Sequence, residues 1–283
     1  MRLQIGARLF EGPGPFLMGV VNVTPDSFSD GGRFADPAAA ADHARALLAE
    51  GADVVDLGGE STRPGAPPVP AEEEIQRVVP VIARLRAGGF ALPISVDTSK
   101  PEVARAALDV GADLVNDVQG LAAPGMAELV AARGVPAVIM HTRGTPADMA
   151  SRAVYGDVVE EVAAELAQAL ARAERAGVPR ARMILDPGIG FAKTAEQSLL
   201  LLAGLGRLRA LGCPLLVGPS RKSFIGKLTG AAVGDRLAGT LAAVAACVLG
   251  GAELVRVHEV AAARQAALVA AAIRDAAAGR GAP

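Results

Sequence analysis

Polar and charged residues stand at or just after the ends of eight short apolar runs, where a protein core would normally place hydrophobic side chains. These residues are Asn22, Glu60-Ser61-Thr62-Arg63, Asp97, Asn116, His141, Asp186, Ser220-Arg221-Lys222, Arg256 and His258. Burying an unpaired carboxylate or ammonium group costs several kcal/mol. Because the pattern repeats along the chain, we expect all eight run ends to converge on one polar site.

The composition of this set points to a class of ligand. Carboxylates and amides on rigid strands can hold a flat heterocycle that carries several N–H groups, and arginine and histidine can hold phosphate. The chain has no Ser-His-Asp order typical of acyl transfer. It also has no His-x-His pair or cysteine cluster typical of a zinc site.

Each candidate also has a plainer interpretation. Asp97 or Asp186 could cap a following helix, although Pro187 cannot donate to Asp186 and the next glycine permits close approach of a ligand. The Ser220–Ser223 turn could be a solvated loop, but Lys222 is one of only four lysines in an arginine-rich chain. The segment Glu60–Gly65 could be a turn or a lid. A structural role for His141 is at least as plausible as a catalytic one.

The apolar runs predict the strands that position these residues. They are Phe16–Val23, Asp53–Leu57, Pro93–Val96, Leu114–Val115, Ala137–Met140, Met183–Leu185, Leu215–Val217 and Leu254–Val257. Helical segments that stop at glycine lie between them. We predict helices over Pro37–Glu50, Ala71–Ala87, Pro101–Val110, Pro124–Arg133, Tyr155–Ala176, Thr194–Leu211, Gly234–Leu249 and Val260–Ala278.

Eight strands that alternate with eight helices predict a TIM (β/α)8 barrel, formed as a single domain over residues 1–283. We expect Met1–Pro15 to form a short hairpin that closes the bottom of the barrel. The alternative is an open doubly wound sheet, but its Gly-x-Gly-x-x-Gly fingerprint is missing after the first strand.

Composition excludes several classes of protein. The 283 residues are 51% hydrophobic and 20% charged, and the net charge of −2 argues against a general nucleic-acid binder. Two cysteines form no disulfide framework, and the N-terminus lacks the pattern of a signal peptide. No apolar run of about 18 residues suggests a membrane span. These features predict a soluble cytoplasmic protein.

Seven of the eight strand ends carry segments that resemble the dihydropteroate synthase family. The segments are Asn22–Gly32, Asp56–Gly65, Ser95–Thr98, Val115–Asp117, Asp186–Phe191, Ser220–Ser223 and Arg256–His258. The resemblance covers the full length in order. It implies a TIM barrel, a homodimer built on the last helices, and a transferase of folate synthesis. The implied reaction joins 6-hydroxymethyl-7,8-dihydropterin pyrophosphate to p-aminobenzoate and releases pyrophosphate, with sulfonamides as competitors.

The resemblance also implies roles for matching residues. Catalytic roles would fall to Asp97, Lys222, Arg63 and Asp26. The pterin would be held by Asp97, Asn116, Asp186 and Lys222, in a pocket lined by Met140, Val118 and Gly218. Pyrophosphate would be bound by Asn22, Thr62, Arg63, Arg256 and His258, with Mg²⁺ at Asn22. The p-aminobenzoate site would comprise Phe28, Thr62, Pro64, Phe191, Lys222 and Ser223.

The chain departs from the family pattern at Ala192, where glycine is expected, at Gln197-Ser198 and at Thr142. None of these positions is among the implied substrate contacts. One alternative is a pterin-binding methyltransferase domain, which would not need Arg63 or the Ser220–Ser223 turn because it binds no pyrophosphate. Another is a binding or regulatory relative without catalysis, but such relatives usually lose loop residues that this chain retains.

Overall fold

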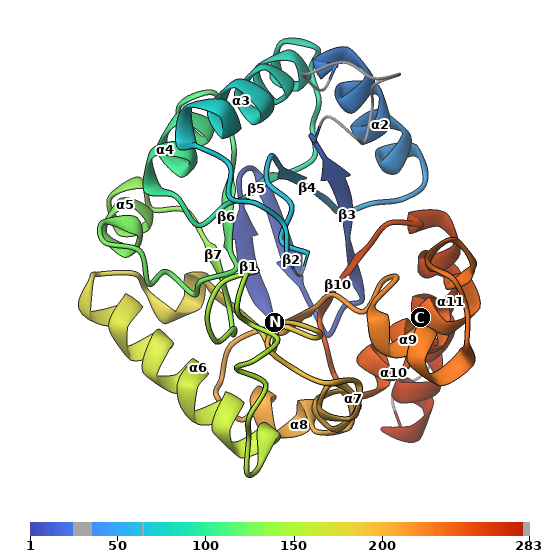
Figure 1. The fold of residues 1–283 in the computed structure, drawn as a ribbon. Coiled ribbons are helices and arrows are strands. Elements are labelled where there is room, and N and C mark those ends of the chain that lie inside the picture. The colour runs from blue at the N-terminus through green and yellow to red at the C-terminus, as the bar shows by residue number, and fades with distance from the viewer. Residues whose placement is uncertain (25–35, 64, 280–283) are drawn as a thin grey trace.

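Eight parallel strands form the centre of the molecule in a computed structural model that describes residues 1–24, 36–63 and 65–279 (Figure 1). In chain order they are β3 (Phe16–Asn22), β4 (Val54–Gly58), β5 (Ile94–Asp97), β6 (Leu114–Asp117), β7 (Ala137–Met140), β8 (Met183–Asp186), β9 (Leu216–Val217) and β10 (Leu254–Val257). The sheet order is β8-β7-β6-β5-β4-β3-β10-β9. A parallel bridge between Leu185 and Leu215 brings β8 back to the segment that leads into β9. The predicted TIM barrel is thereby confirmed.

Helices surround the strands and cover the outer face of the barrel (Figure 1). They are α2 (Pro37–Ala49), α3 (Ala71–Ala87), α4 (Pro101–Asp109), α5 (Met126–Arg133), α6 (Val158–Arg175), α7 (Ala195–Ala203), α8 (Leu205–Arg209), α9 (Ser223–Thr229), α10 (Leu237–Leu249) and α11 (Val260–Ala277), with short 3₁₀ helices η1 (Arg180–Arg182) and η2 (Val233–Asp235). The strands are almost wholly buried because helices pack outside and side chains fill the interior. In the described ranges, no helix combines the length and apolar composition that crossing a bilayer requires.

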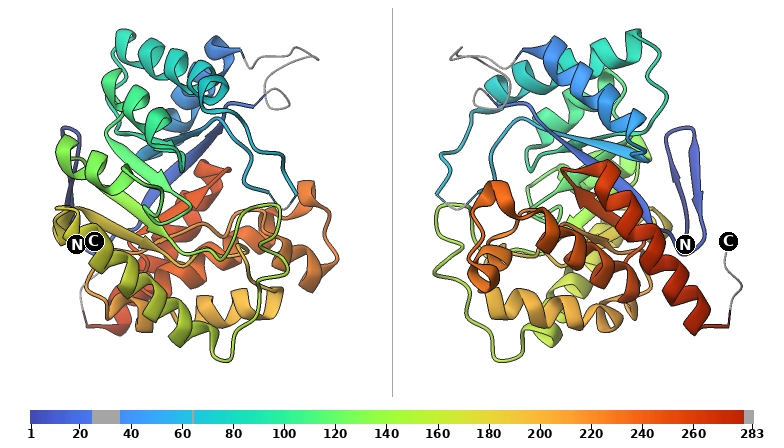
Figure 2. Two further views of the ribbon diagram at one scale, coloured as in Figure 1. Left: turned by 60° about the vertical axis from the view of Figure 1, so that its left-hand side comes forward. Right: turned by 90° about the vertical axis from the view of Figure 1, so that its right-hand side faces the viewer.

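The predicted N-terminal hairpin is present as β1 (Arg2–Ile5) and β2 (Arg8–Glu11), paired antiparallel. Its apolar residues Leu3, Ile5 and Phe10 pack against residues near the starts of barrel strands, including Met18 and Leu254. Figure 2 shows the hairpin at the opposite end of the barrel from the loop that follows β4. The hairpin therefore closes the bottom and leaves the strand C-terminal ends for the polar residues.

Three helical predictions were wrong in detail. The helix predicted from Tyr155 begins at Val158. The segment predicted as one helix over Thr194–Leu211 is broken at Gly204 into α7 and α8. A Cβ at Gly204 would lie 2.9 Å from Cγ1 of Val159, so close packing on α6 requires glycine there. The helix predicted from Gly234 begins at Leu237, and the short helix α9 was not predicted.

Candidate active site

Arg256 joins two carboxylates at the centre of the strand ends. From β10, its Nε donates to Oδ2 of Asp56 at 2.6 Å, and its Nη2 donates to Oδ2 of Asp97 at 2.8 Å. Asn116 on β6 donates from Nδ2 to the same Oδ2 of Asp56 at 2.9 Å. Residues from β4, β5, β6 and β10 thus meet although 200 positions separate Asp56 from Arg256.

Each of these carboxylates keeps one buried oxygen that has no hydrogen-bond partner among the described residues, namely Oδ1 of Asp56 and Oδ1 of Asp97. Burial raises the pKa of Asp97 to about 7, although the nearby Arg256 guanidinium opposes the shift. An unpaired buried acceptor costs free energy unless a ligand supplies a donor. The two oxygens therefore offer acceptors to the N–H groups of a ligand.

Asp186 is the last residue of β8, and Lys222, which directly precedes α9, is a cation close enough to feel its charge. The Asp186 carboxylate is 6% exposed and its Oδ1 accepts the backbone N–H of Gly188 at 2.7 Å. Burial raises the pKa of Asp186, and burial lowers the pKa of Lys222 to about 8 against the attraction of Asp186. Nζ of Lys222 lies 4.1 Å from the centre of the Phe191 ring. This cation and ring form one wall of the site.

The histidine after β10 lies in a strongly positive environment. Oγ of Ser220 accepts the backbone N–H of His258 at 3.3 Å and lies 2.9 Å from its Nδ1. The serine hydroxyl hydrogen is then free to donate to Nδ1, which leaves the histidine proton on Nε2. Burial, followed by the charges of Arg221, Arg256, Lys222 and Arg63, lowers the pKa of His258 to about 3. Neutral imidazole beside several cations is suited to an anionic ligand.

The other residues predicted to line the site occupy the expected strand ends or loops. Asn22 is the last residue of β3 and is partly buried. Met140 ends β7 and is 6% exposed, and Val118 follows β6. Gly218 follows β9, where a Cβ would lie 3.8 Å from that of Arg256.

The loops contribute the remaining candidates. Thr62 is partly buried, Arg63 is exposed, and Ser223 is the exposed first residue of α9. The predicted site residues Asp26, Phe28 and Pro64 lie outside the described residues.

Asp56 was not among the predicted site residues. It was treated as part of an apolar strand, whereas its fully buried side chain holds both Arg256 and Asn116. A carboxylate in the interior of an apolar run was the available signal, because a buried charge requires a partner.

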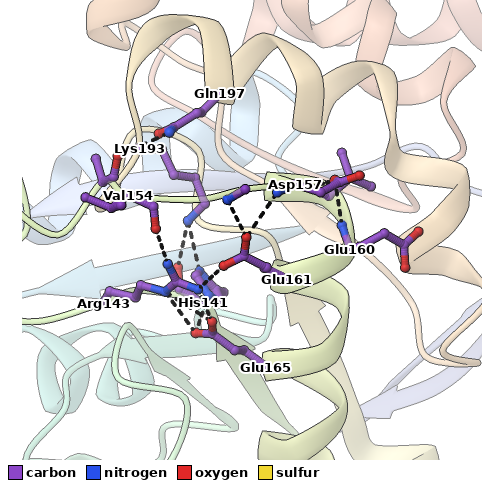
Figure 3. A network of polar contacts seen from close by, with 12 residues as sticks. His141, Arg143, Val154, Asp157, Glu160, Glu161, Glu165, Lys193 and Gln197 are labelled. Atoms are coloured by element: carbon purple, nitrogen blue, oxygen red, sulfur yellow. Dashed lines mark hydrogen bonds and ion pairs between the residues drawn. The ribbon is translucent and has the colours of Figure 1, made fainter.

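Some of the polar side chains at the strand ends are already hydrogen-bonded to other residues of the protein. Glu60 accepts from Lys100 Nζ at 2.7 Å and from the backbone N–H of Val69 at 2.7 Å, which fastens the base of its loop. Arg221 donates from Nε to Glu259 at 2.6 Å. His141 belongs to a separate network with Glu165 and Lys193 (Figure 3).

Ala192 stands where the family pattern has glycine, and its backbone conformation is one that glycine favours. Its φ is 49°, in the left-handed region that favours glycine. The backbone therefore adopts a conformation suited to the glycine expected there.

The described residues offer few donors for a divalent cation. Among the described residues, no group of three or more His, Cys, Asp or Glu side chains could hold a metal ion. Mg²⁺ commonly keeps several waters and binds through one or two protein oxygens plus substrate phosphates. The Asn22 carboxamide oxygen at the mouth of the barrel fits that mode.

The fold and this site define an enzyme of the pterin-binding class. The family described as "Pterin binding enzyme" matches residues 18–258. The dihydropteroate synthase of Escherichia coli K12 is 46% identical over 246 residues, covering 87% of each chain. A probable bifunctional folylpolyglutamate synthase/dihydropteroate synthase of Haloferax volcanii is 48% identical over 87% of this chain, but the match spans only 29% of that longer protein.

Several solved structures are similar to this chain in both fold and sequence. A Xanthomonas albilineans dihydropteroate synthase with 4-aminobenzoic acid has a TM-score of 0.90 and 49% identity, covering 96% of this chain and 98% of its own. The same enzyme with 7,8-dihydropteroate has a TM-score of 0.87 and 46% identity over 97% and 99%. A Yersinia pestis dihydropteroate synthase with a sulfonamide drug has a TM-score of 0.91 and 39% identity over 97% and 100%. The chain belongs to the dihydropteroate synthase family.

Proposed function

We propose that this chain condenses 6-hydroxymethyl-7,8-dihydropterin pyrophosphate with p-aminobenzoate to give 7,8-dihydropteroate and pyrophosphate, as a single pterin-binding domain. The observation that carries this proposal is the pair of buried, unpartnered oxygens of Asp56 and Asp97 beside Arg256 and Lys222. Acceptors for ring N–H groups and cations for an anionic tail are what a pterin pyrophosphate requires.

The pterin half of the substrate would lie against the strands. Asp97, Asn116 and Asp186 would accept or donate hydrogen bonds along its polar edge, and Lys222 would donate to a ring acceptor. Met140, Val118 and Gly218 would line the pocket. Hydrogen bonds to charged groups contribute roughly 1.5–3 kcal/mol each, so these few contacts can fix the ring.

The pyrophosphate would lie toward the rim, where Asn22, Thr62, Arg63, Arg256 and His258 can reach it. His258 would donate from Nε2, because Ser220 occupies its Nδ1. A bound Mg²⁺ would be held by Asn22 and would supply charge neutralisation for the leaving pyrophosphate. Arg63 and Arg256 would stabilise the same developing charge.

The aryl amine would approach beside Phe191, Lys222, Thr62 and Ser223, with Phe28 and Pro64 as further proposed contacts. Its nitrogen forms a bond to the pterin methylene carbon while the carbon–oxygen bond to pyrophosphate breaks. The amine then releases a proton to solvent or pyrophosphate. The carboxylate of Asp97 stabilises positive charge that develops on the pterin, and Asp26 is a further proposed catalytic group. The reaction needs charge placement and no protein nucleophile.

A pterin-binding methyltransferase domain is the second candidate function. That class binds no pyrophosphate, so it gives no reason for the positive environment around His258, to which Arg63 and Arg221 contribute. The cationic rim favours the synthase.

Calorimetry of p-aminobenzoate binding, with and without pyrophosphate plus Mg²⁺, tests the proposal together with a direct assay of dihydropteroate formation. We expect binding only when pyrophosphate and Mg²⁺ are present, and product formation from both substrates. Equal binding in the two conditions, or no product, would contradict it. Sulfonamides should compete with p-aminobenzoate in the same titration.

A homodimer is also proposed, with α10 and α11 as the interface. Leu249, Val269 and Ile273 are 48%, 61% and 55% exposed on these two helices. They line a groove of about 410 Å³ together with Leu241, Ala245 and Ala266. Exposed apolar patches of this kind mark interaction sites, and a second copy would cover this one.

Light scattering should show a dimer for the wild type and a monomer for Val269→Glu. Leu200→Glu, at a 57% exposed position on α7, is the matched control and should remain dimeric. A monomeric wild type would refute this interface. We further propose a cytoplasmic location, which agrees with the two free, buried cysteines Cys213 and Cys247.

A further inference from the structure

A buried lysine outside the proposed substrate contacts is held by three acceptors. Lys193 lies in the loop between β8 and α7 and is 9% exposed. Its Nζ lies 3.0 Å from Nδ1 of His141, 2.9 Å from the carbonyl oxygen of Phe191 and 3.4 Å from that of His141. An ammonium group has three donors, so this environment can satisfy all of them.

His141 connects Lys193 to Glu165 on helix α6. Its Nε2 lies 3.0 Å from Oε2 of Glu165, and Arg143 donates to Glu165 from Nε at 3.1 Å (Figure 3). Burial and the positive charge of Lys193 lower the pKa of His141 to about 4, so the ring is neutral. Burial also lowers the pKa of Lys193 to about 7. When Lys193 is protonated, its ammonium donates to Nδ1 of His141, so the ring proton sits on Nε2 and donates to Glu165.

His141 and Lys193 together hold the two ends of the loop that follows β8. Its backbone N–H donates to the carbonyl oxygen of Asp186 at 2.9 Å. A Cβ at Gly188 would lie 2.0 Å from the carbonyl oxygen of His141, which shows how closely the two backbones approach. At the far end of the loop, Lys193 holds the Phe191 carbonyl.

Phe191 connects the network to the proposed aryl amine pocket, because its ring lies under the ammonium of Lys222 at 4.1 Å. A shift of the Phe191 backbone would therefore move both the ring and its contact with Lys222. Displacements of about 1 Å at a positioning group can cost large factors in rate or affinity. None of the atoms in the network needs to touch substrate for this effect.

We propose that Lys193 and His141 are positioning residues that hold the Phe191 wall in place beside Lys222 and thereby set the affinity for the aryl amine substrate. Glu165 acts through His141 by fixing the tautomer that accepts from Lys193. The proposal rests on the proposed function, because it concerns the aminobenzoate half of that site.

Steady-state kinetics of Lys193→Met separates positioning from a general structural role. Methionine keeps the length of the side chain and removes its three donors. We expect KM for p-aminobenzoate to rise about tenfold, while KM for the pterin pyrophosphate and kcat change by less than about threefold. Lys227→Met, on an exposed lysine of α9, is the matched control and should leave all three parameters unchanged.

Two substitutions of the histidine provide an independent test that does not depend on the folding of Lys193→Met. The amide oxygen of asparagine can replace Nδ1 as the acceptor for Lys193, whereas the amide nitrogen of glutamine can replace Nε2 as the donor to Glu165. His141→Asn should therefore stay within about threefold of the wild-type KM for p-aminobenzoate, and His141→Gln should match Lys193→Met.

Three results would overturn the proposal: an unchanged KM for p-aminobenzoate in Lys193→Met, a parallel rise of both KM values with a lower Tm, or equal effects of His141→Asn and His141→Gln. The wild type is assayed alongside the variants. If the wild type forms no dihydropteroate, the proposed function fails. If it does and the variants behave like it, the positioning role alone fails.

Discussion

Asp97→Asn should make the protein more stable while it loses activity. The Asp97 side chain is 11% exposed, and burial raises its pKa from 3.8 to about 7 despite the hydrogen bond from Arg256. In the folded protein the carboxyl group therefore keeps its proton up to about pH 7, whereas in the unfolded chain it loses that proton near pH 4. Between these values the folded state binds more protons, so its stability falls as pH rises.

The size of this penalty follows from the shift. Each pKa unit corresponds to about 1.4 kcal/mol, which places the cost of ionising Asp97 in the folded protein at no more than about 4 kcal/mol above pH 7. At pH 5 less than half of that cost is present. Asparagine has nearly the same shape and no charge, so it avoids the cost at every pH. The stability gained by Asp97→Asn should therefore be about 2–3 kcal/mol larger at pH 8 than at pH 5.

Urea unfolding of wild type and variant at pH 5, 6, 7 and 8 measures this difference, in which the contributions of titrating groups that do not interact with Asp97 cancel. Asp42→Asn, on a side chain that is 73% exposed, is the control and should show no such trend. At pH 8, where Asp97 is ionised, turnover should fall at least about a hundredfold in Asp97→Asn, because a charged hydrogen-bond acceptor near the pterin is lost. A stability difference that is constant across this pH range, or wild-type turnover, would refute the reasoning.

Lys222→Ala should abolish dihydropteroate formation while the circular dichroism spectrum stays native, because it removes the ammonium beside Asp186 and Phe191; unaltered turnover would refute its assignment. Histidine NMR between pH 5 and 7 should show His258 neutral with its proton on Nε2, since burial and neighbouring cations lower its pKa to about 3; a midpoint above pH 6 would contradict the described environment. Ala192→Gly should change the free energy of unfolding by less than about 1 kcal/mol, because relief at a φ of 49° offsets the added freedom of the unfolded chain, whereas Ala192→Val should cost more than about 2 kcal/mol in the same unfolding experiment.

The barrel was predictable because its signals are local. Alternating apolar runs and helical segments, each helix stopped by glycine, determine the type and order of the elements without knowledge of any distant contact. The errors lie where a contact between distant residues decides. At Gly204 the predicted helix is divided into α7 and α8, and Val159 packs so closely there that a Cβ would not fit. Nothing near Gly204 in the sequence indicates that neighbour.

The candidate site shows the same division. Asp97, Asn116, Asp186 and Arg256 could be found because each interrupts or ends an apolar run. The hydrogen-bond partners of these residues could not be predicted. Strand order and register bring Asp56 to Arg256 across 200 positions. His141 stayed open between two roles for the same reason, because its partners Glu165 and Lys193 come from α6 and from the loop after β8.

Arg256 shows how one residue can serve both halves of the proposed site. A guanidinium group has five N–H donors in a planar fork. Two of them are directed to Asp56 and Asp97 through Nε and Nη2, and in the described part of the chain the others have no recorded partner. Arg256 can therefore keep two buried carboxylates compensated on the pterin side and still donate to pyrophosphate on the rim side. A lysine has no such fork. The position at the end of β10 consequently requires arginine, whereas the compact ammonium of Lys222 suffices beside Asp186.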